Sequence, residues 1–337
     1  MHICCMETGS TKSIRQRPMT LTRLAFSGAI GAVGAGVLTA ATTLRLRARD
    51  QRALLAHPPE GRLLTVNGLQ VHAVERGRGP DLLLIHGASG SSRDFTFSLL
   101  DRLAQDFRVI AFDRPGLGHS DPLPGGDASI AGQIAVLKAA ADQLGVTNPV
   151  LVGQSYGGTV ATAWALQHPA AALVTLAAPS LPWPGHLDVW YRLTARPVPR
   201  ALLVPLASAW VPDGYVQRQI DAVFAPAHAP AGYLDHLGTD LTLRHSQLAA
   251  NVAQINALRD QIVAMEPRYP GLTLPIEMVH GTADTIVPLS IHSGPLAPRL
   301  PSARLTVIEG AGHMPHHTHP QVVLDAIARA ATRAGLR

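Results

Sequence analysis

The alternation of short apolar runs with longer helical stretches is the feature that most constrains the fold of this chain. Leu63–Val66 and Leu69–Val74 flank Asn67-Gly68, a dipeptide that strongly favours a β-hairpin. Further apolar runs follow at Leu82–Ile85, Val109–Phe112, Val150–Val152, Leu173–Leu176, Ile276–Val279 and Leu305–Ile308. Helical patterns lie between them, near 97–105, 129–144, 157–168, 246–264 and 320–334. A hairpin followed by repeated β-α alternation predicts an α/β fold whose mostly parallel sheet is covered by helices.

The alternation fails between about residues 180 and 245, where the sequence is rich in proline and too long for an ordinary connection. We predict that residues 181–245 form a helical cap, inserted into a core made of residues 61–180 and 246–337. The stretch holds seven aromatic residues, Trp183, Trp190, Tyr191, Trp210, Tyr215, Phe224 and Tyr233. Most of these rings are expected to form the cap's own small core, and a few to line an apolar pocket beneath it.

An uncharged run from Leu24 to Leu44 precedes this body. A helix of that length spans roughly 30 Å, the hydrocarbon thickness of a bilayer. Glycine, alanine and threonine dominate the run, so its hydrophobicity is mild. We predict a retained single-pass membrane anchor at residues 24–44, between a basic segment at 1–23 and a charged linker at 45–60.

Two alternatives to the anchor are a poorly packed soluble tail and a cleaved signal peptide, which would release a secreted or periplasmic protein. No A-x-A tripeptide inside the run marks a cleavage site. The side of the membrane is left open, because four basic residues precede the run and four follow it before residue 60. Translation from Met19 would leave only Arg23 before the run and would favour a cytoplasmic catalytic domain.

The net charge of +5 does not indicate a nucleic-acid-binding body. Residues 1–60 hold eight of the 28 Lys and Arg and three of the 23 acidic residues, which leaves twenty of each sign in the body. A nucleic-acid-binding domain carries a net basic face, so no nucleic-acid partner is predicted. The two cysteines, Cys4 and Cys5, are adjacent, which excludes a disulfide scaffold and a C-x-x-C site. Oligomeric state is not predicted.

A nucleophile is indicated at Ser155, in the sequence Gly-Gln-Ser-Tyr-Gly-Gly that follows one predicted strand and opens a predicted helix. In that setting G-x-S-x-G predicts a tight strand-to-helix turn that exposes the serine hydroxyl above the sheet. A serine hydroxyl needs a base, and His313 follows the last predicted strand. The histidine needs an acid, which Asp284 provides after the preceding strand. No Asp or Glu lies between Asp142 and Asp188, so the turn after Leu173–Leu176 offers no competing acid.

These features together resemble the α/β-hydrolase superfamily, in its cap-bearing branch. The resemblance covers about residues 61–335. The motifs that carry it, in order, are His86-Gly87, Arg114-Pro115-Gly116-Leu117-Gly118-His119-Ser120, the serine turn, Asp284 with Val287-Pro288, and Gly312-His313. It implies an eight-stranded sheet whose second strand is antiparallel. It also implies an oxyanion hole formed by the backbone N–H groups of Ala88 and Tyr156.

The residue at the nucleophile position separates branches of this superfamily. Related epoxide hydrolases and haloalkane dehalogenases carry aspartate there, whereas this chain has Ser155. We therefore predict a serine hydrolase that cleaves an ester-like bond (carboxylic ester, thioester, lactone or similar acyl bond) of a small, mainly apolar substrate through an acyl-enzyme. The alternatives on the same triad are a cofactor-free perhydrolase or acyltransferase and a C–C bond hydrolase. A non-catalytic ligand-binding module at the membrane is the alternative from another class.

No cofactor or metal is predicted. The stretch from His313 to His319 is rich in histidine, but no cluster of Cys, Asp or Glu with ligand spacing accompanies it in the sequence. Arg93 and Asp94 have the pattern of a solvated helix start. Asp113 and Arg114, at the end of a strand, are expected to form an ion pair with each other.

Overall fold

The computed structural model describes residues 21–337. They form one sheet of eight strands in the spatial order β1-β2-β4-β3-β5-β6-β7-β8. The strands are β1 (Arg62–Val66), β2 (Leu69–Arg76), β3 (Asp81–Ile85), β4 (Arg108–Phe112), β5 (Val150–Gln154), β6 (Ala172–Leu176), β7 (Ile276–Gly281) and β8 (Ala303–Ile308). Strand β2 is antiparallel to β1 and β4, and the other neighbours are parallel. The predicted fold class, including its antiparallel second strand, is confirmed.

Both faces of the sheet are buried, which explains why its central strands read as continuous apolar runs. Successive residues of a strand point to opposite faces. Leu83 and Ile85 pack in the cluster that contains residues of α4 (Ile130–Gln143) and α5 (Tyr156–Ala165). Leu82 and Leu84 pack with residues of α3 (Leu99–Leu103) and α14 (Pro320–Arg333). With both faces covered, polar chemistry is left to the loops at the carboxyl ends of the strands.

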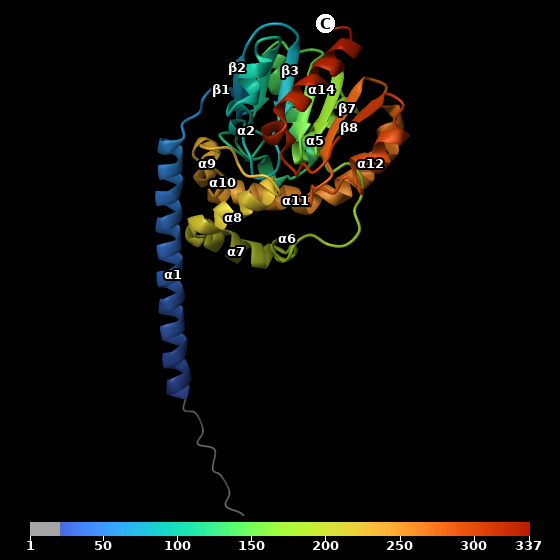
Figure 1. Cartoon of the computed structure of the whole chain (residues 1–337). Coiled ribbons are helices and arrows are strands. Elements are labelled where there is room, and N and C mark those ends of the chain that lie inside the picture. The colour runs from blue at the N-terminus through green and yellow to red at the C-terminus, as the bar shows by residue number, and fades with distance from the viewer. Residues whose placement is uncertain (1–20) are drawn as a thin grey trace, which may run out of the picture.

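A layer of helices interrupts the alternation between β6 and β7. Its members are α6 (Val189–Thr194), α7 (Pro197–Trp210), α8 (Asp213–Phe224), α9 (Tyr233–Leu237), α10 (Thr239–Thr242) and α11 (His245–Met265), followed by the 3-10 segment η2 (Glu266–Gly271). Figure 1 shows α6, α7 and α8 farther from the sheet than α10 and α11. The division of the chain into a core and a cap at 181–245 stays a prediction.

The remaining short elements lie in the loops at the ends of the strands. They are α2 (Arg93–Thr96), η1 (Pro124–Gly126), α12 (Ser293–Leu296), η3 (Ala297–Arg299) and α13 (Pro315–Thr318). Of these, α2 follows the loop after β3, and α13 follows the loop after β8. Both therefore lie close in sequence to residues of the predicted site.

The predicted membrane anchor at residues 24–44 is wrong, and with it the single-pass membrane localisation. No helix among the described residues has the length and apolar character needed to cross a bilayer. Because glycine, alanine and threonine dominate the run, it gains little from transfer into hydrocarbon. The alternative of a cleaved signal peptide stays a prediction. Residues 1–20, which include most of the basic segment and Met19, lie outside the described residues.

Helix α1 (Leu21–Ala56) instead packs its C-terminal part on the helical layer, as Figure 1 shows. Thr42 accepts a hydrogen bond from the indole Nε1 of Trp210 at 3.1 Å, and Arg45 donates to the carbonyl of Ala209 at 2.7 Å. Residues 45–56 of the predicted linker therefore belong to this helix. Contacts with α7, made by residues more than 150 positions away, hold this part of the helix against the protein.

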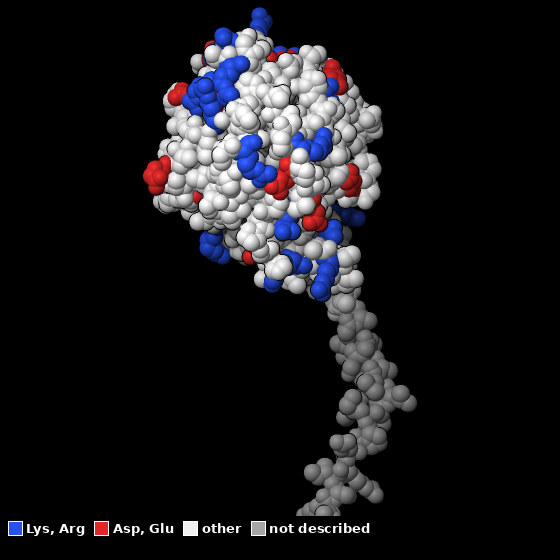
Figure 2. Space-filling view, turned by 90° about the vertical axis from the view of Figure 1, so that its right-hand side faces the viewer, with Lys and Arg blue, Asp and Glu red and all other residues white. Residues whose placement is uncertain are grey.

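Charged side chains are interspersed on the face drawn in Figure 2. Lys and Arg occur there beside Asp and Glu, with wide uncharged areas between them. This face therefore carries no continuous basic stripe of the kind that follows a nucleic-acid backbone.

Candidate active site

Ser155 occupies a sharp turn between β5 and α5. Its backbone has φ +50° and ψ −125°, a conformation that is costly for a residue with a Cβ. The turn is held by hydrogen bonds from Ser155 N to the Leu176 carbonyl and from Gly158 N to the Ser155 carbonyl, both at 2.8 Å. A strained residue fixed by its surroundings is typical of a functional site.

The glycines of this turn are required by close backbone approach. A Cβ at Gly157 would lie 2.0 Å from the Ile85 carbonyl oxygen, and one at Gly153 would lie 2.3 Å from the Gly157 carbonyl oxygen. No side chain fits at such distances. The G-x-S-x-G pattern therefore allows the start of α5 to pack against the end of β3.

Asp284 and His313 come together from loops that follow β7 and β8, two neighbouring parallel strands. Nδ1 of His313 donates to Asp284 Oδ2 at 2.8 Å, and both residues are buried. The bond fixes the tautomer of His313, so Nε2 is left without a proton and can accept one. The two residues that the sequence proposes as acid and base are therefore hydrogen-bonded partners.

Within residues 21–337, Ser155 makes no hydrogen bond to this pair, although its neighbour in the chain contacts the backbone of His313. Gln154, its neighbour in the chain, donates from Nε2 to the His313 carbonyl at 3.3 Å. Among the described residues, no hydrogen bond joins the Ser155 hydroxyl to His313. Serine–base contacts are often long in ligand-free proteins and shorten when substrate binds.

The environment of Asp284 keeps its carboxyl group ionised. Burial acts to raise its pKa, but hydrogen bonds from His280 and His313 outweigh burial and hold the pKa well below the usual range. The backbone N–H groups of Ile286 and Val287 donate to Oδ1 at 2.9 and 2.8 Å. An ionised Asp284 can stabilise an imidazolium at His313 when that ring takes up a proton.

His280 is a member of the site to which the sequence assigned no role. Its Nε2 lies 2.7 Å from the Val287 carbonyl and 3.3 Å from Asp284 Oδ2, and its Nδ1 lies 2.8 Å from Ser293 Oγ. Because the carbonyl and the carboxylate only accept, Nε2 carries the proton and Nδ1 accepts from the Ser293 hydroxyl. His280 therefore positions Asp284. The sequence signal that could have identified His280 is its position at the end of β7, four residues before Asp284.

The two proposed oxyanion donors come from two segments next to Ser155. Tyr156 opens α5, and Ala88 follows Gly87, where a Cβ would lie 3.2 Å from Ser155 Cβ. The loop after Ala88 is held from α11, because Asn251 Oδ1 accepts from Ser89 N at 2.8 Å. The assignment of Ala88 and Tyr156 as oxyanion donors stays a prediction.

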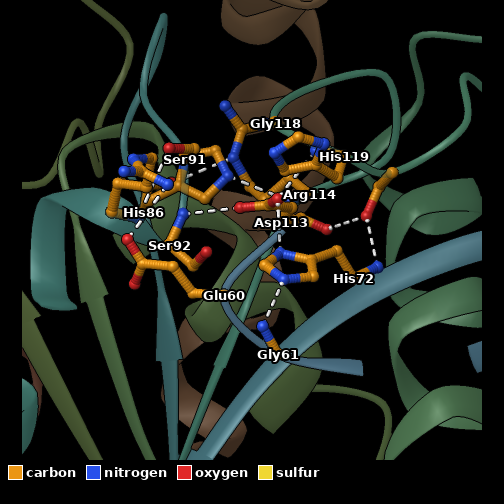
Figure 3. Close-up of polar contacts among 12 residues, drawn as sticks. Glu60, Gly61, His72, His86, Ser91, Ser92, Asp113, Arg114, Gly118 and His119 are labelled. Carbon is orange, nitrogen blue, oxygen red and sulfur yellow. Dashed lines mark hydrogen bonds and ion pairs between the residues drawn. The ribbon is translucent and has the colours of Figure 1, made fainter. Parts of the chain in front are cut away.

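Arg114 does not form the expected ion pair with Asp113. Its guanidinium is fully buried and donates to the carbonyls of His86 and Gly87, each at 2.9 Å. Figure 3 shows Arg114 and His86 close together. It also donates to Gln133 and Gln254, and it lies 4.3 Å from the centre of the Tyr156 ring. Arg114 thereby joins the loop before Ala88 to the first residue of α5.

Asp113 makes a separate buried network. It accepts from Nδ1 of His72 at 2.8 Å, from Ser92 N at 2.6 Å and from His119 N at 2.8 Å (Figure 3). These bonds tie β2 and two loops to the end of β4. Asp113 and Arg114 are thus each satisfied by other partners, which the local sequence does not reveal.

Buried neutral histidines make the fold sensitive to acid. Burial lowers the pKa of His86 to about 4, and burial with the nearby His280 lowers that of His292 to about 4. His86 donates from Nδ1 to the Gly87 carbonyl and accepts at Nε2 from Arg114 N, so its ring is neutral. In the unfolded chain both rings titrate near pH 6.5.

We expect the free energy of unfolding to fall as pH drops from about 6.5 to about 4, because the unfolded chain binds more protons in that window. Above about pH 6.5 the stability is fully present, and His86 alone accounts for about 3 kcal/mol of the loss. Urea unfolding followed by circular dichroism at several pH values measures it. Replacement of the exposed His186 by Gln should leave the slope unchanged. A constant free energy of unfolding across the window would contradict the prediction.

Comparisons with known proteins agree with this architecture. The profile of the alpha/beta hydrolase family matches residues 82–326, more than half of the chain. A pimeloyl-[acyl-carrier protein] methyl ester esterase of Aeromonas hydrophila is 31% identical over 271 residues, which cover 76% of this chain and 97% of that protein. A 2-hydroxymuconate semialdehyde hydrolase of Pseudomonas putida is 29% identical, covering 78% of this chain and 91% of its own.

A solved structure extends the likeness to the fold. The structure of a thermophilic esterase from Thermogutta terrifontis superposes with a TM-score of 0.65 at 22% identity, covering 81% of this chain and 97% of that one. The order of the sheet, the strained serine turn and the matched residues lead to one conclusion: this chain belongs to the α/β hydrolase family.

Proposed function

We propose that this hydrolase is a serine hydrolase that cleaves an ester-like acyl bond of a small, mainly apolar substrate. The proposal is supported by the hydrogen bond between His313 and Asp284, together with the strained turn that holds Ser155 at φ +50°. A serine, a histidine and a buried ionised acid are the three parts that nucleophilic acyl transfer needs.

The first half of the reaction forms an acyl-enzyme. Ser155 Oγ attacks the carbonyl carbon of the substrate while Nε2 of His313 takes the hydroxyl proton, and Asp284 stabilises the imidazolium. The charge that develops on the carbonyl oxygen is bound by the N–H groups of Ala88 and Tyr156, each worth about 3–4 kcal/mol in such sites. The imidazolium then gives its proton to the leaving group as the bond to the acyl carbon breaks.

The second half releases the acyl group. His313 removes a proton from water, which attacks the acyl carbon, and the same two N–H groups bind the second oxyanion. Collapse of this intermediate returns the proton to Ser155 and frees the carboxylic acid. One water molecule is consumed for each acyl bond that is cleaved.

The preference for an apolar substrate is supported by the side chains next to His313. Met314 packs in a buried apolar cluster with Phe224 and Tyr233 of the helical layer. These two rings belong to the set expected to form the cap's own core. The predicted pocket beneath the cap stays a prediction.

C–C bond hydrolysis on the same triad is the second candidate. It is favoured by the relative named 2-hydroxymuconate semialdehyde hydrolase. Assays that offer 2-hydroxymuconate semialdehyde beside short-chain and methyl esters distinguish the two. Turnover of the semialdehyde together with much slower turnover of every ester would select C–C hydrolysis.

Labelling with a fluorophosphonate tests the proposal without a known substrate. We expect the full-length protein to be modified at Ser155, as located by mass spectrometry, because the probe reports a serine activated by its base. His313→Ala should abolish labelling. Exposed His186→Gln is the matched control and should label like the wild type. If folded wild-type protein is not modified, or is modified equally in His313→Ala, the serine-hydrolase proposal fails and a ligand-binding role gains support.

A further inference from the structure

A second group of ionisable side chains lies next to the candidate active site but takes no part in the proposed reaction. Asp94 is on α2, and His316 and His317 are on α13, more than 220 positions away. Nε2 of His316 lies 3.0 Å from Asp94 Oδ2, and Nε2 of His317 lies 2.8 Å from Asp94 Oδ1. Asp94 is only 3% exposed, so the solvated helix start expected from the sequence is wrong.

The three residues present ligand atoms toward one another. One atom from each lies within 4.8 Å of the others, and this is the one such group of His, Cys, Asp and Glu within residues 21–337. Ligand atoms around one Zn²⁺ ion, each about 2.0–2.2 Å from it, are roughly 3–4 Å apart. Small side-chain movements would therefore bring all three atoms to a single ion. The histidine-rich stretch does have an acidic partner, supplied by a residue far away in sequence.

Tyr233 offers a candidate fourth ligand atom. The hydroxyl of Tyr233, on α9, donates to Asp94 Oδ1 at 2.7 Å. Both imidazole side chains are fully buried. Two imidazole nitrogens and a carboxylate thus come together in a buried site, with the Tyr233 hydroxyl hydrogen-bonded to that carboxylate.

Hydrogen bonding alone does not satisfy this cluster. Each imidazole uses Nε2 toward Asp94, whereas the buried Nδ1 atoms of His316 and His317 have no hydrogen-bond partner within the described part of the protein. Buried polar atoms without partners are uncommon and carry a free-energy cost. Nδ1 of each ring is thus free to carry the ring proton when Nε2 binds an ion through its lone pair.

We propose that Asp94, His316 and His317 bind a divalent transition-metal ion, with the Tyr233 hydroxyl as a fourth ligand. Imidazole with one carboxylate suits Zn²⁺ and its neighbours rather than Mg²⁺ or Ca²⁺, which prefer all-oxygen sites. The ion would bind the two Nε2 atoms through their lone pairs, and each ring proton would move to Nδ1 of the same ring. The role of the ion would be structural, because it would join α2, α13 and α9 of the helical layer.

Zinc binding to the full-length protein tests the site. The protein is prepared without a histidine tag, stripped with a chelator, and titrated with Zn²⁺ by calorimetry, with elemental analysis after gel filtration. We expect one Zn²⁺ per chain and a rise in the thermal midpoint with zinc concentration, because the ion binds only the folded state. Co²⁺ in its place should give the visible absorption of a tetrahedral site.

Two variants assign the ligands. Asp94→Asn and His317→Gln should each weaken zinc binding at least about tenfold. The exposed His228→Gln is the matched control and should bind like the wild type. Circular dichroism checks that each variant folds, and if one does not, the cobalt spectrum of the wild type alone decides. Absence of zinc binding by folded wild-type protein, or equal binding by folded His317→Gln, would overturn the site.

Discussion

Ser155→Ala should lower the turnover of short-chain nitrophenyl esters by about 10⁶-fold and leave the fold intact. Removal of the hydroxyl removes the attacking atom, so no acyl-enzyme can form. The residual rate comes from substrate binding and the oxyanion donors, which the substitution does not touch. Steady-state rates at saturating ester measure the loss, and the thermal midpoint reports the fold.

Ser290→Ala is the control for this experiment. Ser290 is exposed and lies in the loop after β7, so loss of its hydroxyl should leave the rate within about twofold of the wild type. Near-normal turnover by Ser155→Ala would exclude Ser155 as the nucleophile. A large loss of thermal stability would instead show that the turn depends on the hydroxyl for folding.

Asp284→Asn is expected to lower turnover by about 10⁴-fold with little effect on the apparent affinity for ester. The acid now accepts four hydrogen bonds and faces Nδ1 of His313 at 2.8 Å. An amide there carries no charge to stabilise the imidazolium. If its NH₂ group faces His313, Nδ1 must accept and the base nitrogen Nε2 carries the proton. Both effects act on kcat.

Asp101→Asn is the matched control, because its carboxyl group is exposed and lies on α3. It should leave kcat and KM unchanged. Fluorophosphonate labelling of Asp284→Asn should be slower by a similar factor. If Asp284→Asn keeps the rate of the wild type, another group orients His313 and the proposed triad is incorrect.

Much of the fold followed from local pattern. The central strands of the sheet are apolar runs because both faces are buried, and Asn67-Gly68 marked the hairpin. The membrane anchor failed for a physical reason as well. The run is long enough for a spanning helix, but its composition is not apolar enough. Thr42 and Arg45 instead have hydrogen-bond partners on α7.

Some residues of the candidate sites were likewise identified from the sequence, and others only from the structure. By itself the sequence placed Ser155 in a glycine-flanked turn and put Asp284 and His313 after successive strands, because strand order and turn geometry depend on neighbours in the chain. Only the tertiary structure decided that Arg114 binds carbonyls beside Ala88, and that Asp94 meets His316 and His317. Those contacts join segments that the sheet brings together, and no local pattern records burial or a partner so far away in sequence.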